Sequence, residues 1–234
     1  MPSKKLTSNP TTEVPAENSA GVIKSTAALD KLSSLALNKE QIVERQMVAQ
    51  STKYIAGKLA IKGQITVFFA GPNTGKTLIS LRLIADIYHQ GILYEHTYHI
   101  NLDDDYAGTT TKASIGLTNG FRVITAEKLT KPLEHFKELI ELLVCSGAAK
   151  NTIFILDTIK KFADVMDKKA MSAFITDCRR LTSAGGSIIV LAHTNKITND
   201  ESKVIPGGTS DLLDDCDCAY VLSISNKEQT DDGL

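Results

Sequence analysis

Short apolar runs alternate with longer amphipathic segments between residues 65 and 223. Several of the runs are apolar throughout rather than at every second position, which is typical of strands that are covered on both faces. The predicted strands are Ile65–Ala70, Thr97–Leu102, Phe121–Thr125, Thr152–Leu156, Ser187–Ala192 and Ala219–Ser223. The predicted helices between them are Thr77–His89, Leu133–Ser146 and Lys168–Thr182. This alternation predicts an α/β fold in which crossover helices join the strands of a mainly parallel sheet.

The third predicted helix has the clearest periodicity, with one apolar face at helical spacing that we expect to be buried. The residues on this face are Met171, Phe174, Ile175, Cys178 and Leu181. Cys178 and Cys145, which lies in the preceding helix, are expected to be core thiols. Cys216 and Cys218 are flanked by aspartates, but no second Cys or His pair follows at zinc spacing. We therefore interpret them as the start of a buried strand.

The first part of the chain has a different character. Residues 1–25 are rich in Ser, Thr, Pro, Asn and Lys and contain no aromatic residue. Such a segment buries too little apolar surface to offset its ordering entropy, so we predict a flexible tail. Residues 26–54 carry two weak helical patterns, the second of which begins at Asn38 with Gln41 three positions later. We expect a helical adaptor that packs on the main domain or on a neighbouring subunit, followed by the α/β domain over 55–234.

Composition and charge limit the classes of function. The chain has 234 residues, with 26 Lys and Arg against 27 Asp and Glu, and a net charge of −1. This balance argues against a protein that coats nucleic acid or an anionic membrane through bulk charge, although it leaves room for a local basic loop. No apolar run reaches the roughly 20 residues that a membrane-spanning helix needs, and no secretory signal opens the chain. With four cysteines in no disulfide pattern, we expect a cytoplasmic protein without a membrane partner.

A phosphate-binding loop is the strongest chemical signal in the sequence. The segment from Ala70 to Thr77 fits the phosphate-loop pattern, with Ala in place of the first Gly, and Leu78 continues it into the helix. Backbone N–H groups of such a turn face an anion, and the helix that follows adds its positive end. The candidate nucleotide-binding residues are Ala70, Gly71, Pro72, Asn73, Thr74, Gly75, Lys76, Thr77 and Leu78. The alternative, a Gly/Pro turn with a solvated lysine, is disfavoured because a predicted strand precedes the loop and a predicted helix follows it.

Two residues of this loop and one later aspartate have expected roles in binding ATP and Mg²⁺. Lys76 is expected to reach the β- and γ-phosphates, and the Thr77 hydroxyl is expected to bind Mg²⁺. Asp157 ends the apolar run from Thr152, and it is the second expected metal residue because ligands sit at the carboxyl edge of such sheets. Its alternative interpretation is a surface Asp at the end of a strand.

Two further strand ends carry polar groups. Asp103, Asp104 and Asp105 follow the second strand, and Asp103 is a candidate to orient or deprotonate the attacking water. For Asp105 we prefer a solvated acidic loop. His193 follows the buried run Ile188–Ala192, where a role as sensor of the γ-phosphate competes with a purely structural role. The candidate catalytic residues are therefore Lys76, Asp103, Asp104, Asp157 and His193.

Taken in order, these motifs resemble the RecA-like ATPases, and more closely the RepA-like and DnaB-like hexameric helicase branch. The resemblance spans about 55–222 and includes the phosphate loop, the strands ending INLD, FILDT and LAHTNK, and the segment PGGTS at 206–210. It implies a doubly wound RecA-like sheet and ATP hydrolysis at a subunit interface of a homo-oligomer, as a hexameric ring or a filament. Asp103 stands where the family has a catalytic glutamate, so the resemblance implies that the water sits closer, that Asp104 contributes, or that hydrolysis is slow.

The resemblance also suggests what the protein acts on. Family loops that contact single-stranded DNA correspond to Lys160–Lys169 and to Asn195–Gly208, while solvated loop lysines are the alternative. We therefore expect an ATPase that acts on DNA in replication, recombination or repair. The alternative function is an ATP-dependent switch or assembly protein with a protein partner. RecA-like cores usually continue beyond the strand at 219–223, so we expect a truncated or reduced version of such a core.

Overall fold

The computed structural model describes residues 19–50, 53–91, 96–198, 204–206 and 211–223. The chain divides into two units, Met1–Ser51 and Thr52–Leu234. The sequence-based boundary of the α/β domain, at residue 55, stays a prediction. Residues 1–18 of the predicted tail lie outside the described residues.

The first unit contains two helices, α1 (Ser19–Leu35) and α2 (Lys39–Gln50). Helix α1 begins inside the segment predicted to be a flexible tail. Helix α2 begins with the predicted capping pair, because Asn38 Oδ1 accepts from the Gln41 backbone N–H at 2.8 Å and Gln41 Oε1 accepts from the Asn38 N–H at 3.0 Å. These reciprocal bonds satisfy two of the donors that a helix start leaves free.

The second unit is built on a parallel sheet whose main strands lie in the order β5-β4-β6-β7-β3-β9. Each neighbouring pair in this order is parallel. The strands are β3 (Ile65–Ala70), β4 (His96–Asn101), β5 (Arg122–Thr125), β6 (Thr152–Asp157), β7 (Ser187–Thr198) and β9 (Cys218–Leu222). The predicted α/β fold with a mainly parallel sheet is thus confirmed.

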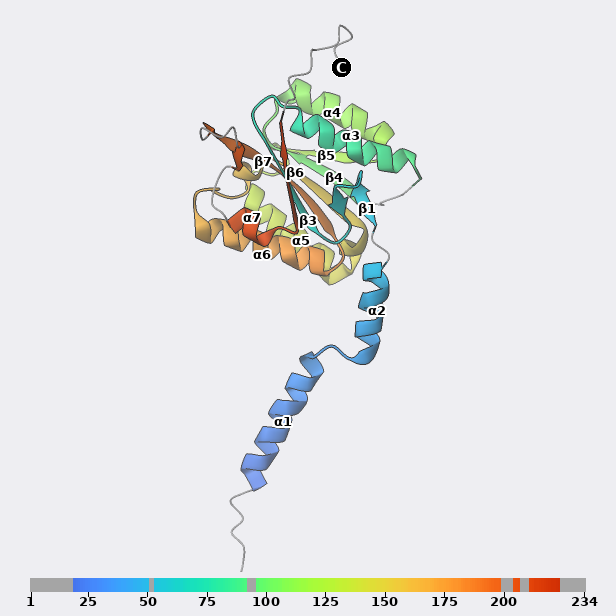
Figure 1. The fold of residues 1–234 in the computed structure, drawn as a ribbon, viewed down its shortest axis with the longest axis vertical. Coiled ribbons are helices and arrows are strands. Elements are labelled where there is room, and N and C mark those ends of the chain that lie inside the picture. The colour runs from blue at the N-terminus through green and yellow to red at the C-terminus, as the bar shows by residue number, and fades with distance from the viewer. Residues whose placement is uncertain (1–18, 51–52, 92–95, 199–203, 207–210, 224–234) are drawn as a thin grey trace, which may run out of the picture. The chain divides into compact units, whose positions relative to one another are not determined.

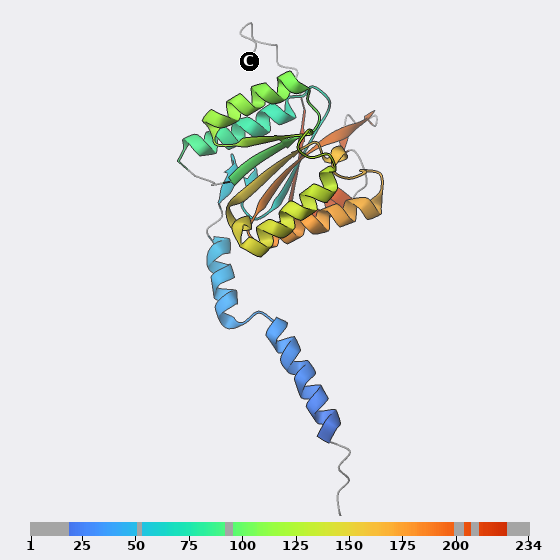
Figure 2. The same ribbon diagram turned by 180° about the vertical axis from the view of Figure 1, so that it is seen from behind.

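Helices cover both faces of this sheet (Figures 1 and 2). Helices α3 (Lys76–His89) and α4 (Tyr106–Asn119) lie on one face, and α5 (Pro132–Ser146) and α6 (Lys168–Ser183) lie on the other. The short elements are β1 (Tyr54–Ala56), β2 (Ala60–Ile61), η2 (Ala148–Asn151), η3 (Ile159–Lys161), β8 (Val204–Pro206) and α7 (Asp211–Asp215). None of the helices that the structure describes has the length and apolar character needed to cross a membrane.

Two apolar cores form because the sheet is covered twice. Strands β3 and β6 are buried at every residue, as their uninterrupted apolar runs predicted. On the α5 and α6 side, Phe136 stacks against Phe174 and meets Phe154 edge-on. The predicted face of α6 is fully confirmed, since all five of its apolar residues are buried. The prediction that Cys145 is a core thiol is wrong, because Cys145 is exposed on α5.

Helix α4 and the end of strand β7 differ from the sequence-based prediction. Helix α4 was not predicted; Asp105 caps its start by accepting from the Gly108 N–H at 2.7 Å, and Gly120 ends it in the left-handed region. Strand β7 continues past its predicted end at Ala192 to Thr198, where it pairs antiparallel with β8. The segment Asn195–Gly208, predicted to be a loop, therefore contains a β-hairpin, of which residues 199–203 and 207–208 lie outside the described residues.

Candidate functional site

The carboxyl ends of four strands meet at one cavity of about 960 Å³. Strand register brings the polar residues together: Ala70 at the end of β3 pairs with His193 on β7, and Asn101 at the end of β4 pairs with Asp157 on β6. Ligands in open α/β sheets occupy this edge. Its volume lies near the upper end of the range of roughly 300 to 1,000 Å³ that is usual for ligand pockets.

The loop between β3 and α3 turns through two residues in the left-handed region. Asn73 has φ 59° and Gly75 has φ 78°. Glycine adopts this conformation without strain, and asparagine tolerates it better than most residues. The Thr74 hydroxyl donates to the Gly71 carbonyl at 2.8 Å and so closes the turn. The result is a concave stretch of backbone of the kind that receives anions.

Helix α3 opens directly onto this cavity. Gly75 is its N-cap and, within the described chain, no side chain caps the helix start, so the first N–H groups remain available to a ligand. Pro72 through Leu78 line the cavity, and Lys76 lies among them without an ion-pair partner among the described residues. Ala70 and Gly71 stand outside the lining, because Ala70 is buried in the sheet below the loop.

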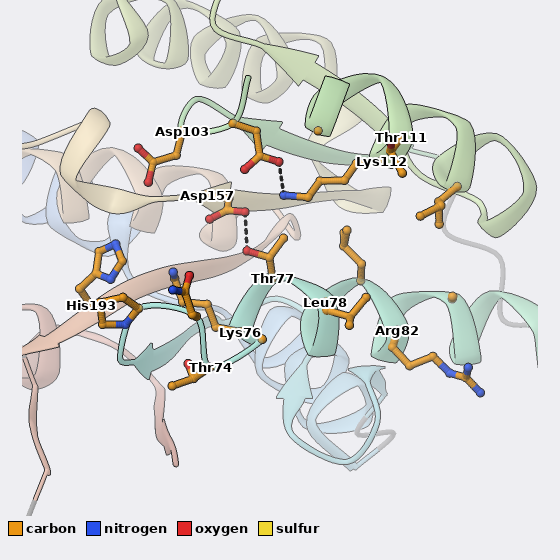
Figure 3. A pocket seen from close by; sticks show the side chains of 18 of the residues that line it. Thr74, Lys76, Thr77, Leu78, Arg82, Asp103, Thr111, Lys112, Asp157 and His193 are labelled. Atoms are coloured by element: carbon orange, nitrogen blue, oxygen red, sulfur yellow. Dashed lines mark hydrogen bonds and ion pairs between the residues drawn. The ribbon is translucent and has the colours of Figure 1, made fainter. Parts of the chain in front are cut away.

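Thr77 and Asp157 are directly hydrogen-bonded across the cavity floor. The Thr77 hydroxyl donates to Asp157 Oδ2 at 2.8 Å, and Figure 3 shows the two side chains pointing toward one another. Asp157 is only 3% exposed. Burial acts to raise the pKa of Asp157, but hydrogen bonds from His99 and Thr77 and the charge of Lys112 outweigh it, so the pKa is lowered. Asp157 is therefore a buried carboxylate that stays ionised.

Asp103 lies on the cavity wall and is paired with two lysines. Its Oδ2 is 3.3 Å from Lys160 Nζ, and its Oδ1 is 3.4 Å from Lys161 Nζ. Partial burial acts to raise the pKa of Asp103, but hydrogen bonds and charge from Lys160 and then Lys161 lower it overall. A carboxylate with a lowered pKa accepts hydrogen bonds well and takes up protons poorly.

Asp104 also lines the cavity, but its carboxylate is held by other groups. It forms an ion pair with Lys112 of α4, drawn as a dashed line in Figure 3. Its Oδ2 also accepts from Asn101 Nδ2 at 2.9 Å. These contacts connect the end of β4 to α4, whereas the ion pairs of Asp103 connect the end of β4 to Lys160 and Lys161 in η3.

His193 reaches the cavity from β7. Burial lowers the pKa of His193, with the positive charges of Lys76 and Lys160 acting in the same direction against Asp103 and Asp157. Its Nε2 is buried and has no hydrogen-bond partner among the described residues. A buried polar atom without a partner, on a residue that lines the cavity together with Lys76, makes His193 a candidate for contact with a ligand.

The segment Lys160–Lys169 differs from the open loop predicted from the sequence. It begins in η3, buries Phe162 and Ala163 in the core, and ends in the first turn of α6. Asp167 caps that turn by accepting from the N–H groups of Lys169 and Ala170. The second lysine-bearing segment has Lys196 within β7, and Lys203 lies outside the described residues.

Helix α4, which was not predicted from the sequence, forms one wall of the cavity. Thr111, Lys112 and Ile115 from this helix face Leu81 and Ala85 of α3 across the cavity. The wall was missed because the segment is rich in threonine and has no apolar stripe. An Asp at 105 and a Gly at 120, flanking a segment without proline, were the signal that could have indicated a helix.

Comparison with models of protein families found no match, and neither did comparison with curated proteins. Among solved structures, the chain is similar to a KaiC-like protein from the hyperthermophilic archaeon Pyrococcus horikoshii OT3. The two are 12% identical, with a TM-score of 0.45, over 64% of this chain and 75% of that chain. A likeness of this extent transfers nothing about function, so the functional argument depends on the cavity itself.

Proposed function

We propose that this protein binds ATP with Mg²⁺ in the cavity at the carboxyl edge of the sheet and hydrolyses its γ-phosphate. The observation that carries the proposal is the meeting of Lys76, Thr77 and Asp157 at one phosphate loop, with Thr77 bonded to Asp157 at 2.8 Å. The loop N–H groups and the start of α3 bind the phosphate oxygens. Lys76 adds a positive charge beside the β- and γ-phosphates.

The donor set at Thr77 and Asp157 fits Mg²⁺. A hydroxyl and an ionised carboxylate are hard oxygen ligands, which Mg²⁺ prefers. Among the described residues, no group of three His, Cys, Asp or Glu side chains could hold a metal by itself. The rest of the shell would therefore come from phosphate oxygens and water, which is the usual arrangement for Mg²⁺ with a nucleotide. When bound, Mg²⁺ neutralises charge on the β- and γ-phosphate oxygens.

The hydrolytic step needs a positioned water. Its oxygen bonds to the γ-phosphorus while the bond from that phosphorus to the β–γ bridging oxygen breaks, which yields ADP and inorganic phosphate. Asp103 accepts a hydrogen bond from this water and so orients it. The lowered pKa of Asp103 favours orientation over proton uptake, so the water proton leaves with the phosphate product. The His193 side chain contacts the γ-phosphate or its water and reports its presence along β7.

We further propose that the ATPase acts on single-stranded DNA in replication, recombination or repair, as a helicase-type homo-oligomer. The hairpin of β7 and β8 extends directly from His193, and Lys160 and Lys161 lie beside Asp103, which supports coupling between a polyanion and the hydrolytic site. Four free cysteines support a reducing cytoplasmic location. The competing function is a nucleotide-dependent switch with a protein partner, favoured by the net charge of −1 and by Asp in place of Glu.

Steady-state ATPase assays with and without single-stranded DNA test these proposals. Lys76→Ala should abolish nucleotide binding and turnover, because it removes the phosphate-loop charge. Lys128→Ala, which removes an exposed lysine away from the cavity, is the matched control and should behave like the parent. Turnover in Lys76→Ala equal to the parent's would refute the phosphate-loop site. Clear hydrolysis that ignores DNA would favour the switch.

A further inference from the structure

A histidine that has no role in the proposed hydrolysis is buried against the proposed metal site. His99 lies in β4 and is 0% exposed. Its Nε2 is 3.2 Å from Oδ2 of Asp157, on the neighbouring strand β6. The other side of the ring meets Phe121 edge-on, with ring centroids 6.4 Å apart. Among the described residues, the one polar contact of this buried ring is with Asp157.

The hydrogen-bond pattern determines which ring nitrogen carries the proton. His99 Nδ1 is buried and has no partner among the described residues. A proton on Nδ1 would leave a buried N–H unpaired and would also turn the bare lone pair of Nε2 toward a carboxylate. A proton on Nε2 instead donates to Asp157 Oδ2 and leaves Nδ1 as an unpaired acceptor, which is the less costly arrangement. His99 therefore donates to Asp157 through Nε2.

Both donors reach the same oxygen of Asp157. Thr77 Oγ1 and His99 Nε2 each donate to Oδ2, and no described residue donates a hydrogen bond to Oδ1. Two hydrogen bonds to one carboxylate oxygen fix the rotation of the carboxylate about its Cβ–Cγ bond. The His99 bond is also the largest of the contributions that lower the pKa of Asp157 against the effect of burial.

We propose that His99 is a positioning residue for the metal site: by donating to Asp157 Oδ2, it holds Oδ1 toward the hydration shell of Mg²⁺. This inference rests on the proposed function. Outer groups that orient a metal-binding side chain typically affect metal affinity by about 10- to 100-fold when removed. His99 occupies such a position, on a rigid central strand and without direct access to the ligand.

Two substitutions separate this role from simple packing. Gln places an amide nitrogen close to the position of imidazole Nε2, so His99→Gln keeps the donor. Met has a similar volume and no donor, so His99→Met keeps most of the packing and loses the hydrogen bond. If the cooperative unfolding transition of His99→Met is lost, His99→Asn takes its place, because the Asn amide is too short to reach Asp157.

Equilibrium titration of the full chain with a fluorescent ATP analogue, in Mg²⁺ and in EDTA, measures the gain in affinity that Mg²⁺ provides. We expect His99→Met to lose about tenfold of that gain, with affinity in EDTA close to the parent's, and His99→Gln to recover most of it. The proposal would be overturned if His99→Met kept the parent's gain in affinity from Mg²⁺. It would also be overturned if His99→Gln lost as much of this gain as His99→Met. A parent that binds the analogue without any gain from Mg²⁺ would refute the metal site itself, while a parent that does not bind it would refute the proposed function.

Discussion

The carboxylate of Asp103 lies 3.3 Å from the ammonium nitrogen of Lys160, and Lys161 holds its second oxygen. The same two lysines belong to the segment that we propose for contact with DNA. Asp103 and a DNA phosphate would therefore compete for the same positive charges. Both lysines are more than 40% exposed, so their ammonium groups are accessible to an external anion.

Removing both lysines should change the acid side of the pH profile. In the double variant Lys160→Ala with Lys161→Ala, Asp103 loses the charges that lower its pKa, so that pKa should rise. Activity that needs ionised Asp103 is lost as pH falls through this pKa. The acid limb of kcat/KM should therefore move to higher pH than in the parent, as measured by steady-state assays across the acidic range. The double variant Lys168→Ala with Lys169→Ala removes the same charge from the start of α6, and a similar shift there would contradict the explanation.

The same lysine variants test the contact with nucleic acid. Each phosphate contact to a single strand contributes about 0.7 to the slope of log affinity against log salt. Loss of Lys160 and Lys161 should therefore reduce that slope by about 1.4, as measured by fluorescence anisotropy of a labelled single strand over a salt series. An unchanged slope and an unchanged affinity would exclude these two lysines as DNA contacts.

Asp103 and Asp104 are adjacent but should respond differently to the same change. Asp103→Asn should lower kcat by about 100-fold or more, because the water loses its charged acceptor, and should leave ATP affinity near the parent's. Asp104→Asn should leave kcat close to the parent's, since its carboxylate contacts Lys112 and Asn101. Single-turnover hydrolysis beside equilibrium binding distinguishes the two. Equal losses in both variants would mean that Asp104 also acts in the reaction.

Asp217 provides a test of stability outside the cavity. Its Oδ2 accepts from the buried Ile65 N–H at 2.7 Å and from Arg179 at 2.6 Å, which joins β3 to α6. Asp217→Ala leaves that N–H unpaired and should lower the free energy of unfolding by about 1–3 kcal/mol. Asp217→Asn keeps an acceptor and should cost less. Guanidinium denaturation measures both, and equal stability of Asp217→Ala and the parent would show that the N–H finds another partner.

Most of the sheet could be predicted from the sequence because its strands are buried on both faces. A mostly apolar run such as Ile65–Ala70, with Thr66 as its one polar residue, favours a central strand, and the structure has a strand with the same ends. Because parallel strands place their carboxyl ends at one edge, Asp103, Asp157 and His193 could be expected near the phosphate loop, and they do line one cavity with it. These inferences need only the order of motifs along the chain.

The contacts inside the site could not be predicted in the same way. The bond between His99 and Asp157 depends on the register of two strands, which joins residues 58 positions apart. Leu78 is 70% exposed, because the first turn of α3 lies at the cavity rather than over the sheet. Helix α4 has weak apolar periodicity, since its role is to form the cavity wall. Pattern reasoning fails at these places because side-chain pairing, rather than burial, determines them.

Strand β7 has a mechanical consequence. It passes the cavity at His193 and runs on to Thr198, and its pairing with β8 contains a register shift between Thr194 and Thr198. An extended strand is nearly inextensible along its axis, and its first half is clamped between β3 and β6. Beyond His193 the strand partner of β7 among the described residues is β8 alone, so the mechanical support of β7 changes at the residue that lines the cavity.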